Sequence, residues 1–343
     1  MTIRIRPVDL DREHEELLGV LERNLPDLPH ARRFKWIYRD CHLGPAWSWL
    51  LWDSESREPV GVASLFRRAI WRADKVEVCG QVGDFAIDPS HRSLGPALML
   101  QRATFGPVDS GHLALCYDCP PNARGMSTFR RLRMTSSATM KRHTRLLRSD
   151  RQIAKYLGRG LATAAAAGLG NAVIRLASWG RRRRSVGVEI ALHPGRFDEE
   201  FSVLDRRVGG GDVVRGRRAA EDLNWRYRDD PLQDYQVLTA RRSGELVGFV
   251  VVTTARHDLV VVDLFGTLSS DEAADLLDAA ARLGREGGLE ALHTLVSADH
   301  PLTAPLRMAG FRARECGPHV VAYAGGRPES GNTWQLTYAD VMA

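Results

Sequence analysis

The feature that most constrains this chain is an unusual pentapeptide that occurs twice. Residues 36–40 read Trp-Ile-Tyr-Arg-Asp and residues 225–229 read Trp-Arg-Tyr-Arg-Asp, so the copies stand 225 minus 36, or 189, residues apart. In each half the pentapeptide follows a strand-like and a helix-like stretch and precedes two strand-like stretches. A chain that repeats its elements in one order folds into repeated units. The pattern therefore predicts an internal duplication.

The similarity continues beyond the pentapeptides. The second strand of each pair opens with Val-Gly, and the strand after it carries one aspartate, Asp84 or Asp263. Where the copies end, at Met134 and Phe311, the offset is 311 minus 134, or 177. Chance similarity among β-branched strands would explain one match, whereas several matches in order favour duplication. We expect the aromatic residues of the pentapeptides to pack each domain's helices on its own sheet: Trp36, Tyr38, Trp225 and Tyr227.

The duplication predicts an α/β (α+β) protein of two tandem domains, each a mixed, mostly antiparallel sheet flanked by helices. We place the first domain at residues 1–148 and the second at residues 186–343. Residues 149–185 form a linker with an alanine-rich helical stretch, whose uncharged run is shorter than the roughly 20 residues that span a bilayer. The linker ends in four arginines that indicate either a solvated segment or a peripheral contact with an anionic membrane: Arg181, Arg182, Arg183 and Arg184.

The net charge and the cysteine content indicate which partners and which cellular compartment suit the chain. The chain has 48 Lys and Arg against 42 Asp and Glu, a net charge of +6, which suits a phosphorylated cofactor, nucleic acid or an anionic membrane. Its five cysteines have no framework spacing and its first residues lack the apolar stretch of a signal peptide, so we expect a cytoplasmic location. Cys116 and Cys119 have C-x-x-C spacing without a second pair, so no metal site is predicted.

One turn in the first half has the properties of an anion site. The strand at residues 82–88 runs directly into a turn and then a helix whose first turn contains Gly95, Pro96 and Ala97. Small residues let another molecule approach the backbone, and the free amides at a helix N-terminus favour negative charge. The turn is therefore a candidate phosphate site, although Arg92 and Gly95 acting only as helix caps is an alternative. Dinucleotide-binding and P-loop motifs are absent from the sequence.

The spacing Arg92-x-x-Gly95-x-Ala97 resembles the pyrophosphate-binding turn of the GNAT superfamily of acyl-CoA-dependent N-acyltransferases. Residues 113–117 and 122–134 resemble that family's fifth strand and the helix after it, although Arg-Met replaces the usual Gly-Phe at its end. The resemblance implies a tandem GNAT protein, and the W-x-Y-R pattern is similar to members associated with exopolysaccharide or cell-envelope biosynthesis. It also implies acetyl-CoA, or another acyl-CoA, as cofactor, bound by Phe85, Ala86, Ile87, Arg92, Ser93, Leu94, Gly95, Pro96, Ala97 and Asn122.

The second half departs from this pattern at the corresponding turn. Residues 267–277 carry a helix start with Ser270 as the expected cap, followed by Asp271 and Glu272. These acids would repel a pyrophosphate from the helix N-terminus. We expect the second copy to keep the scaffold, to leave CoA unbound and to help shape the substrate site.

Acyl transfer needs a base for the acceptor amine, a donor to the thioester carbonyl and an acid for the leaving thiolate. The family's usual tyrosine acid corresponds to Phe129 here, which cannot donate a proton. Tyr117 is then the predicted acid, with a packed strand tyrosine as the alternative. Asp84 or Asp118 is the predicted base, directly or through water, and a structural or substrate-orienting role is the alternative for Asp84.

These expectations combine into an acyltransferase that moves an acetyl or other acyl group from acyl-CoA to an amine, or a hydroxyl, of a small molecule or sugar. One alternative is a non-catalytic acyl-CoA-binding or scaffold protein of an envelope polysaccharide pathway. A further alternative is an aminoacyl-tRNA-dependent transferase on the same doubled fold. The intact CoA turn disfavours it, so nucleic acid is not an expected partner.

Overall fold

The computed structural model describes residues 3–120, 122–158, 161–179, 187–329 and 331–341. The first half contains β1 (Ile3–Pro7), α1 (His14–Asn24), α2 (His30–Phe34), a π-helical turn (Lys35–Arg39), β2 (Trp47–Asp53), β3 (Glu58–Arg72), β4 (Lys75–Ile87), a 3-10 turn (Pro89–His91), α3 (Leu94–Asp109), β5 (Cys116–Asp118), α4 (Ala123–Arg131) and β6 (Ala138–Leu146).

Two helices and the second half follow. These elements are α5 (Asp150–Leu157), α6 (Leu161–Trp179), β7 (Glu189–Leu192), α7 (Glu199–Val208), β8 (Val213–Gly216), α8 (Ala220–Tyr227), β9 (Tyr235–Arg242), β10 (Glu245–Ala255), β11 (Asp258–Gly266), α9 (Ser270–Glu286), β12 (Ala291–Ser297), α10 (Thr303–Met308), β13 (Arg312–Ala324), β14 (Arg327–Pro328), β15 (Thr333–Trp334) and α11 (Tyr338–Val341).

The strands form one continuous path whose order reads alike from both ends. From one edge it runs β1-β2-β3-β4-β5-β13, and from the other β7-β9-β10-β11-β12-β6, with β13 and β6 paired where the two series meet. The pairs β4–β5 and β11–β12 are parallel, and their neighbours in the path are antiparallel. The predicted α/β class, a mixed and mostly antiparallel sheet flanked by helices, is confirmed.

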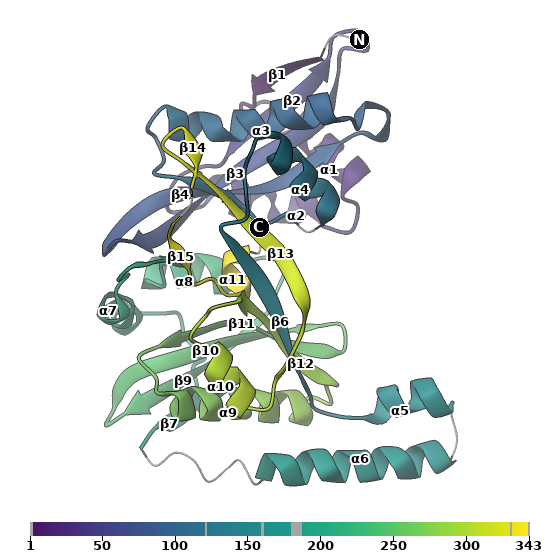
Figure 1. The fold of residues 1–343 in the computed structure, drawn as a ribbon, viewed down its shortest axis with the longest axis vertical. Coiled ribbons are helices and arrows are strands. Elements are labelled where there is room, and N and C mark those ends of the chain that lie inside the picture. The colour runs from purple at the N-terminus through teal and green to yellow at the C-terminus, as the bar shows by residue number, and fades with distance from the viewer. Residues whose placement is uncertain (1–2, 121, 159–160, 180–186, 330, 342–343) are drawn as a thin grey trace.

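Each half gives its last long strand to the other. β6 pairs along its length with β12, from Ala291 opposite Leu146 to Ser297 opposite Met140. β13 in turn reaches β5, where Val321 lies opposite Asp118. Figure 1 shows β6 descending into the second half while β13 rises into the first. The domain boundaries at residues 148 and 186 stay a prediction. The sheet of each half contains a strand from the other half.

Helices cover both faces of the first half's sheet. Leu17 and Leu21 of α1 pack with Leu50 and other residues on one face. Leu100 of α3 packs with Leu51 on the opposite face, as expected when neighbouring residues of a strand point to opposite sides. Strands covered on both faces are buried along most of their length, which explains their nearly continuous apolar sequences.

The two pentapeptides meet each other. The indole rings of Trp36 and Trp225 stack with centroids 5.1 Å apart. The Nε1 of Trp36 donates to the Trp225 carbonyl at 2.7 Å, and the Nε1 of Trp225 donates to the Trp36 carbonyl at 3.2 Å. Trp225 is buried in the core of the first half, so the expectation that it packs on its own sheet is wrong, whereas Trp36 packs on the core of its own half and also contacts Trp225.

The two tyrosines of the pentapeptides make a second matched pair of contacts. The Tyr38 hydroxyl donates to Asp84 at 2.6 Å, and the Tyr227 hydroxyl donates to Asp263 at 3.1 Å. Both tyrosines are buried. Each tyrosine thus ties the pentapeptide of its half to the aspartate of its own central strand.

Helices α5 and α6 form an arm that projects from the second half (Figure 1). The arm is held at its base by Asn171, which receives a hydrogen bond from the Ser149 amide at 2.8 Å. The side chains of Leu169, Val173 and Leu176 are exposed on α6. Within the described ranges, no helix is long and apolar enough to cross a membrane. The arginines at 181–184 lie outside the described residues.

Candidate active site

The candidate site begins where two parallel strands separate. β4 pairs with β5 at Gly80 opposite Cys116 and Gln81 opposite Tyr117, and β4 then continues to Ile87. The register of β4 against β3 shifts near its end, and Asp84 has a φ of 48°. A bulge of this kind redirects the side chains around it. The gap between the separated strands becomes a cavity.

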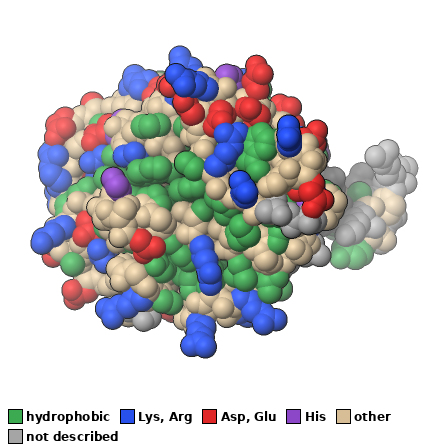
Figure 2. Space-filling view, turned by 90° about the horizontal axis from the view of Figure 1, so that it is seen from above, with side chains coloured by type: hydrophobic (Ala, Val, Ile, Leu, Met, Phe, Trp, Pro, Cys, Tyr) green, Lys and Arg blue, Asp and Glu red, His purple; other side chains and the backbone are tan. Residues whose placement is uncertain are grey.

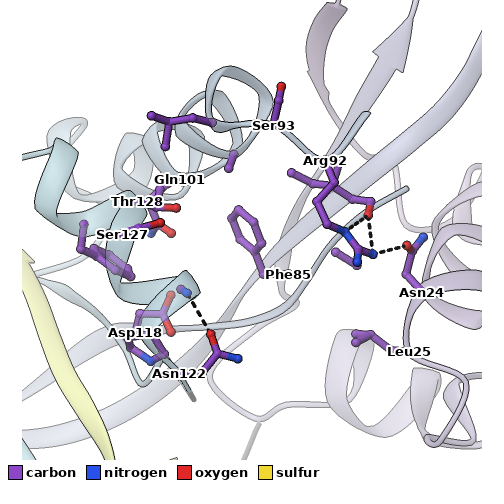
Figure 3. A pocket seen from close by; sticks show the side chains of 17 residues that line it. Asn24, Leu25, Phe85, Arg92, Ser93, Gln101, Asp118, Asn122, Ser127 and Thr128 are labelled. Carbon is purple, nitrogen blue, oxygen red and sulfur yellow. Dashed lines mark hydrogen bonds between the residues drawn. The ribbon is translucent and has the colours of Figure 1, made fainter. Parts of the chain in front are cut away.

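This cavity has a volume of about 450 Å³. One wall comes from the end of β4, a second from the first turns of α3, and a third from the end of β5 with α4. Phe85 lies between Arg92 on one side and Gln101 and Thr128 on the other (Figure 3). The predicted cofactor residues that line this cavity are Phe85, Ala86, Ile87, Arg92, Ser93, Leu94, Ala97 and Asn122.

Gly95 and Pro96 belong to the same turn without lining the cavity. Ser93 precedes α3 in an extended conformation, and its side chain makes no capping hydrogen bond. The amides of Leu94 and Gly95 begin the helix and so have no partner within it. A Cβ placed at Gly95 would meet no atom within 4 Å. With no acidic residue in this turn, the helix N-terminus presents free amides and open space to an anion.

Arg92 is held beside this turn by the protein backbone. Its Nε and Nη2 donate to the Ile87 carbonyl at 3.1 and 3.0 Å, and Nη2 also donates to Asn24 Oδ1 at 3.3 Å. Figure 3 shows this arrangement at the edge of the cavity. Arg92 is exposed, so its charge remains available to a ligand.

Of the three predicted catalytic residues, Asp118 lines the cavity. It ends β5 on the wall opposite Phe85, near Asn122 (Figure 3). Burial raises the pKa of the Asp118 carboxyl to about 7, although a hydrogen bond from the Cys119 amide opposes the shift. A carboxylate with this pKa can take a proton near neutral pH.

Tyr117 and Asp84 face other parts of the protein. The Tyr117 hydroxyl is buried and donates to the Asp340 carbonyl at 2.8 Å. Asp84 forms a buried ion pair with Arg33 and accepts the hydroxyl of Tyr38. Sequence reasoning also missed cavity residues at the end of α1 and on α3 and α4 that carry no motif: Asn24, Leu25, Gln101, Ser127 and Thr128.

The second half has a cavity of about 300 Å³ in the matching position, between the end of β11 and the start of α9. There the cap is Ser269 rather than the predicted Ser270. Ser269 accepts the Glu272 amide at 3.3 Å, and Glu272 accepts the Ser269 amide at 2.8 Å. Arg242 pairs with Glu272 at 2.6 Å. The start of α9 is therefore closed by a reciprocal cap that α3 lacks, and acids stand in its first turn.

The first half's outer face carries both signs of charge. Lys and Arg side chains alternate with Asp and Glu around its rim, and hydrophobic side chains gather toward its centre (Figure 2).

In the described part of the chain, no cluster of three or more His, Cys, Asp or Glu residues is arranged to hold a metal ion.

Comparison with known proteins identifies the fold. No family model and no curated protein matches the chain. A probable N-acyltransferase from Enterococcus faecalis has 12% identity and a TM-score of 0.63, over 94% of this chain and 72% of the other. A GCN5-related N-acetyltransferase from Anabaena variabilis has 11% identity and a TM-score of 0.62, over 93% and 72%. One from Kribbella flavida has 16% identity and a TM-score of 0.57, over 93% and 71%.

These likenesses cover both halves of the chain, so the predicted GNAT fold is confirmed. At this level of identity the comparison establishes the architecture. A shared fold does not by itself define the reaction that a protein catalyses.

Proposed function

We propose that this protein is an acyl-CoA-dependent acyltransferase whose cofactor binds in the cavity between β4 and β5. The observation that carries the proposal is the start of α3, where free amides, an open Gly95 and the charge of Arg92 adjoin the cavity. The CoA pyrophosphate would accept hydrogen bonds from the Leu94 and Gly95 amides. The pantetheine arm would follow the end of β4 past Phe85 toward Asp118.

The cavity supplies a base for the transfer step. An acceptor amine beside Asp118 would lose a proton to the carboxylate as its nitrogen attacks the thioester carbonyl. The carbon–sulfur bond then breaks and the CoA thiolate leaves. Tyr117 as the acid for that thiolate would require its hydroxyl to leave the Asp340 carbonyl. We propose an amine of a small molecule or sugar as acceptor, with envelope polysaccharide precursors as one class to test.

A second candidate function, acyl-CoA binding without turnover, has a specific observation in its favour. Phe129 stands on the cavity wall where the family's tyrosine is expected, and the Tyr117 hydroxyl is engaged elsewhere. Both candidates suit a cytoplasmic protein, since all five cysteines are free and thiols persist in a reducing compartment.

Titration calorimetry with acetyl-CoA tests cofactor binding. Gly95→Glu would place a carboxylate on the helix N-terminus and is expected to weaken binding at least tenfold. Gly106→Glu is the matched control, because Gly106 lies on the same helix with equally open space around its Cβ. Equal affinity in wild type and Gly95→Glu would refute the proposed binding mode.

Measuring the release of free thiol distinguishes an acyltransferase from a protein that only binds acyl-CoA. Acetyl-CoA is incubated with the protein and a panel of amines and amino sugars, and free CoA is measured with a thiol reagent. Acceptor-dependent release that is lost in Gly95→Glu supports the transferase. Tight binding of acetyl-CoA without release across the panel supports the second candidate.

A further inference from the structure

A smaller cavity lies between the two halves, beside the stacked tryptophans. It has a volume of about 140 Å³, and none of its lining residues lines the cavity at α3. Trp36 and Trp225 form part of its wall, as do the guanidinium-bearing Arg68 and Arg226. It is therefore a separate compartment with cationic walls.

Arg68 brings a buried positive charge to this cavity. Only 6% of the residue is exposed. Its Nε donates to Gln81 Oε1 and its Nη1 to the Arg67 carbonyl, both at 2.9 Å, and its guanidinium lies 4.9 Å from the Trp225 ring centre. Among the described residues no carboxylate forms an ion pair with it. Burial lowers the pKa of Arg68 to about 10, so the group is still charged at neutral pH.

Arg226 adds to the positive charge of the cavity. Its Nη1 donates to the Ala339 carbonyl, and its Asp340 partner lies 3.8 Å away. That carboxylate is already held by Arg218 at 2.8 Å. Repulsion from Arg226 is one cause of the lowered pKa of Arg68. Arg226 thus has one distant carboxylate partner, which Arg218 also holds, and Arg68 has no ion-pair partner among the described residues.

Asp230 is the acidic residue among those that line the cavity, and its oxygens already have hydrogen-bond partners. Its oxygens accept the Leu232 amide at 2.8 Å and the Tyr235 hydroxyl at 2.9 Å. Burial raises the pKa of its carboxyl, and the hydrogen bonds from Leu232 and Tyr235 oppose that shift. Arg33, also on the wall, is paired with Asp84 outside it. The cavity keeps an excess of positive charge, and a buried cation without a counter-ion is unfavourable.

We propose that this cavity binds a small oxyanion, a carboxylate or phosphate group, between the guanidinium groups of Arg68 and Arg226. Planar guanidinium groups bind both kinds of oxyanion through paired hydrogen bonds. A cavity of about 150 Å³ holds a molecule of the size of benzene, so the ligand is a small acid or one acidic group of a larger molecule. The Trp36 and Trp225 rings would pack against its apolar part.

The test is titration of inorganic phosphate and, separately, malonate into the full-length protein in HEPES buffer, followed by calorimetry. We expect saturable binding of at least one of them at one site. Arg68→Met and Arg226→Met, which keep side-chain bulk and remove charge, are each expected to weaken that binding at least tenfold. Arg307→Met, on the exposed surface of α10, is the charge-matched control and should bind as wild type does. Circular dichroism checks folding, and if one arginine variant fails to fold the other decides the result.

Preference between the two probes tells a phosphate site from a carboxylate site. Gly95→Glu should bind both probes as wild type does, and the arginine variants should keep their affinity for acetyl-CoA. Absence of saturable binding in wild type would overturn the proposal. It would also be overturned by equal binding in both arginine variants, or by binding lost only in Gly95→Glu, because the anion would then sit at α3. Each result is independent of whether the protein transfers acyl groups.

Discussion

Asp118 is the cavity residue whose surroundings favour proton transfer near neutral pH. It ends the short strand β5, lines the cavity at α3 and has a pKa of about 7 because of its burial. Near neutral pH the carboxyl is present in both forms. A group in this state can accept a proton from an ammonium acceptor and release it afterwards.

We expect Asp118→Asn to lower kcat by a factor of about 10² to 10⁴, the usual contribution of a general base. In wild type kcat/KM should rise with pH up to about 7, and this limb should be missing from the variant. Steady-state thiol release across pH 5.5–8.5 measures both. Asp109→Asn removes a carboxylate that accepts the Tyr323 hydroxyl and does not line the cavity, so it serves as control. Full turnover by Asp118→Asn would exclude this residue as the base.

The same residue predicts a pH dependence of stability. Its pKa is higher in the folded chain than the unfolded value near 3.9, so the folded state binds more protons between about pH 4 and pH 7. The free energy of unfolding should therefore fall as pH rises through this window. Asp118→Asn should be more stable than wild type at pH 8, by on the order of 4 kcal/mol for a pKa that rises from about 3.9 to about 7, and similar to it at pH 4. Urea denaturation at both pH values checks this. The prediction would be contradicted if the free energy of unfolding fell by the same amount from pH 4 to pH 8 in Asp118→Asn as in wild type.

Residue types in the site were predictable from sequence, but side-chain directions were not. Asp84 was recognised as an acid in a central strand, yet the bulge at its positive φ aims it at Arg33 and Tyr38. The partner of Tyr117 is a carbonyl 223 residues away. Contacts of this separation leave no local signal, which is also why Gln101 and Thr128 were missed.

At the scale of elements, the two matching helix starts differ in whether side chains cap them. The start of α9 is satisfied by a capping box, whereas Ser93 makes no side-chain cap on α3. Local patterns of this kind are readable from sequence, because the residues that satisfy the amides lie within one turn of them. The predicted helix start with acids in its first turn is present in the second half, with the cap displaced by one residue, and the expectation that this half leaves CoA unbound stays a prediction.

The difference in capping between α9 and α3 predicts a difference in the free energy of unfolding of the two serine variants. Ser269→Ala removes a hydrogen bond to a helix amide and should lower the free energy of unfolding by about 1 kcal/mol. Ser93→Ala removes no such bond and should change it by less than about 0.5 kcal/mol. Urea titrations of both variants beside wild type provide the comparison. A loss at Ser93 equal to that at Ser269 would mean that α3 is capped like α9.

At the scale of the whole molecule, the exchanged strands make the halves interdependent. Residues 1–148 alone would leave β5 without β13 at its edge and would expose β6, whose partner strand β12 would be missing. Unpaired edges of this kind associate with other chains. The element order was predictable from sequence, but the exchange was not, because strand-forming residues do not specify which distant strand they pair with.

We expect residues 1–148 expressed alone to aggregate or to self-associate, and to unfold without a cooperative transition. Coexpression with residues 186–343 should restore a soluble one-to-one complex, since each fragment carries the strand that the other lacks. Size-exclusion chromatography with light scattering measures this. A monomeric, cooperatively folding fragment 1–148 would show that the exchanged strand is dispensable.

The place of β13 also sets when the first half can finish folding during synthesis. Its strands β1 to β5 leave the ribosome early, but the strand that closes their edge is completed roughly 200 residues after β5, or about 10–40 s later at ordinary rates of translation. Until then the edge next to the proposed CoA cavity stays open. The nascent chain therefore has a long interval in which a chaperone, or a second nascent copy, can occupy the position that its own β13 takes later.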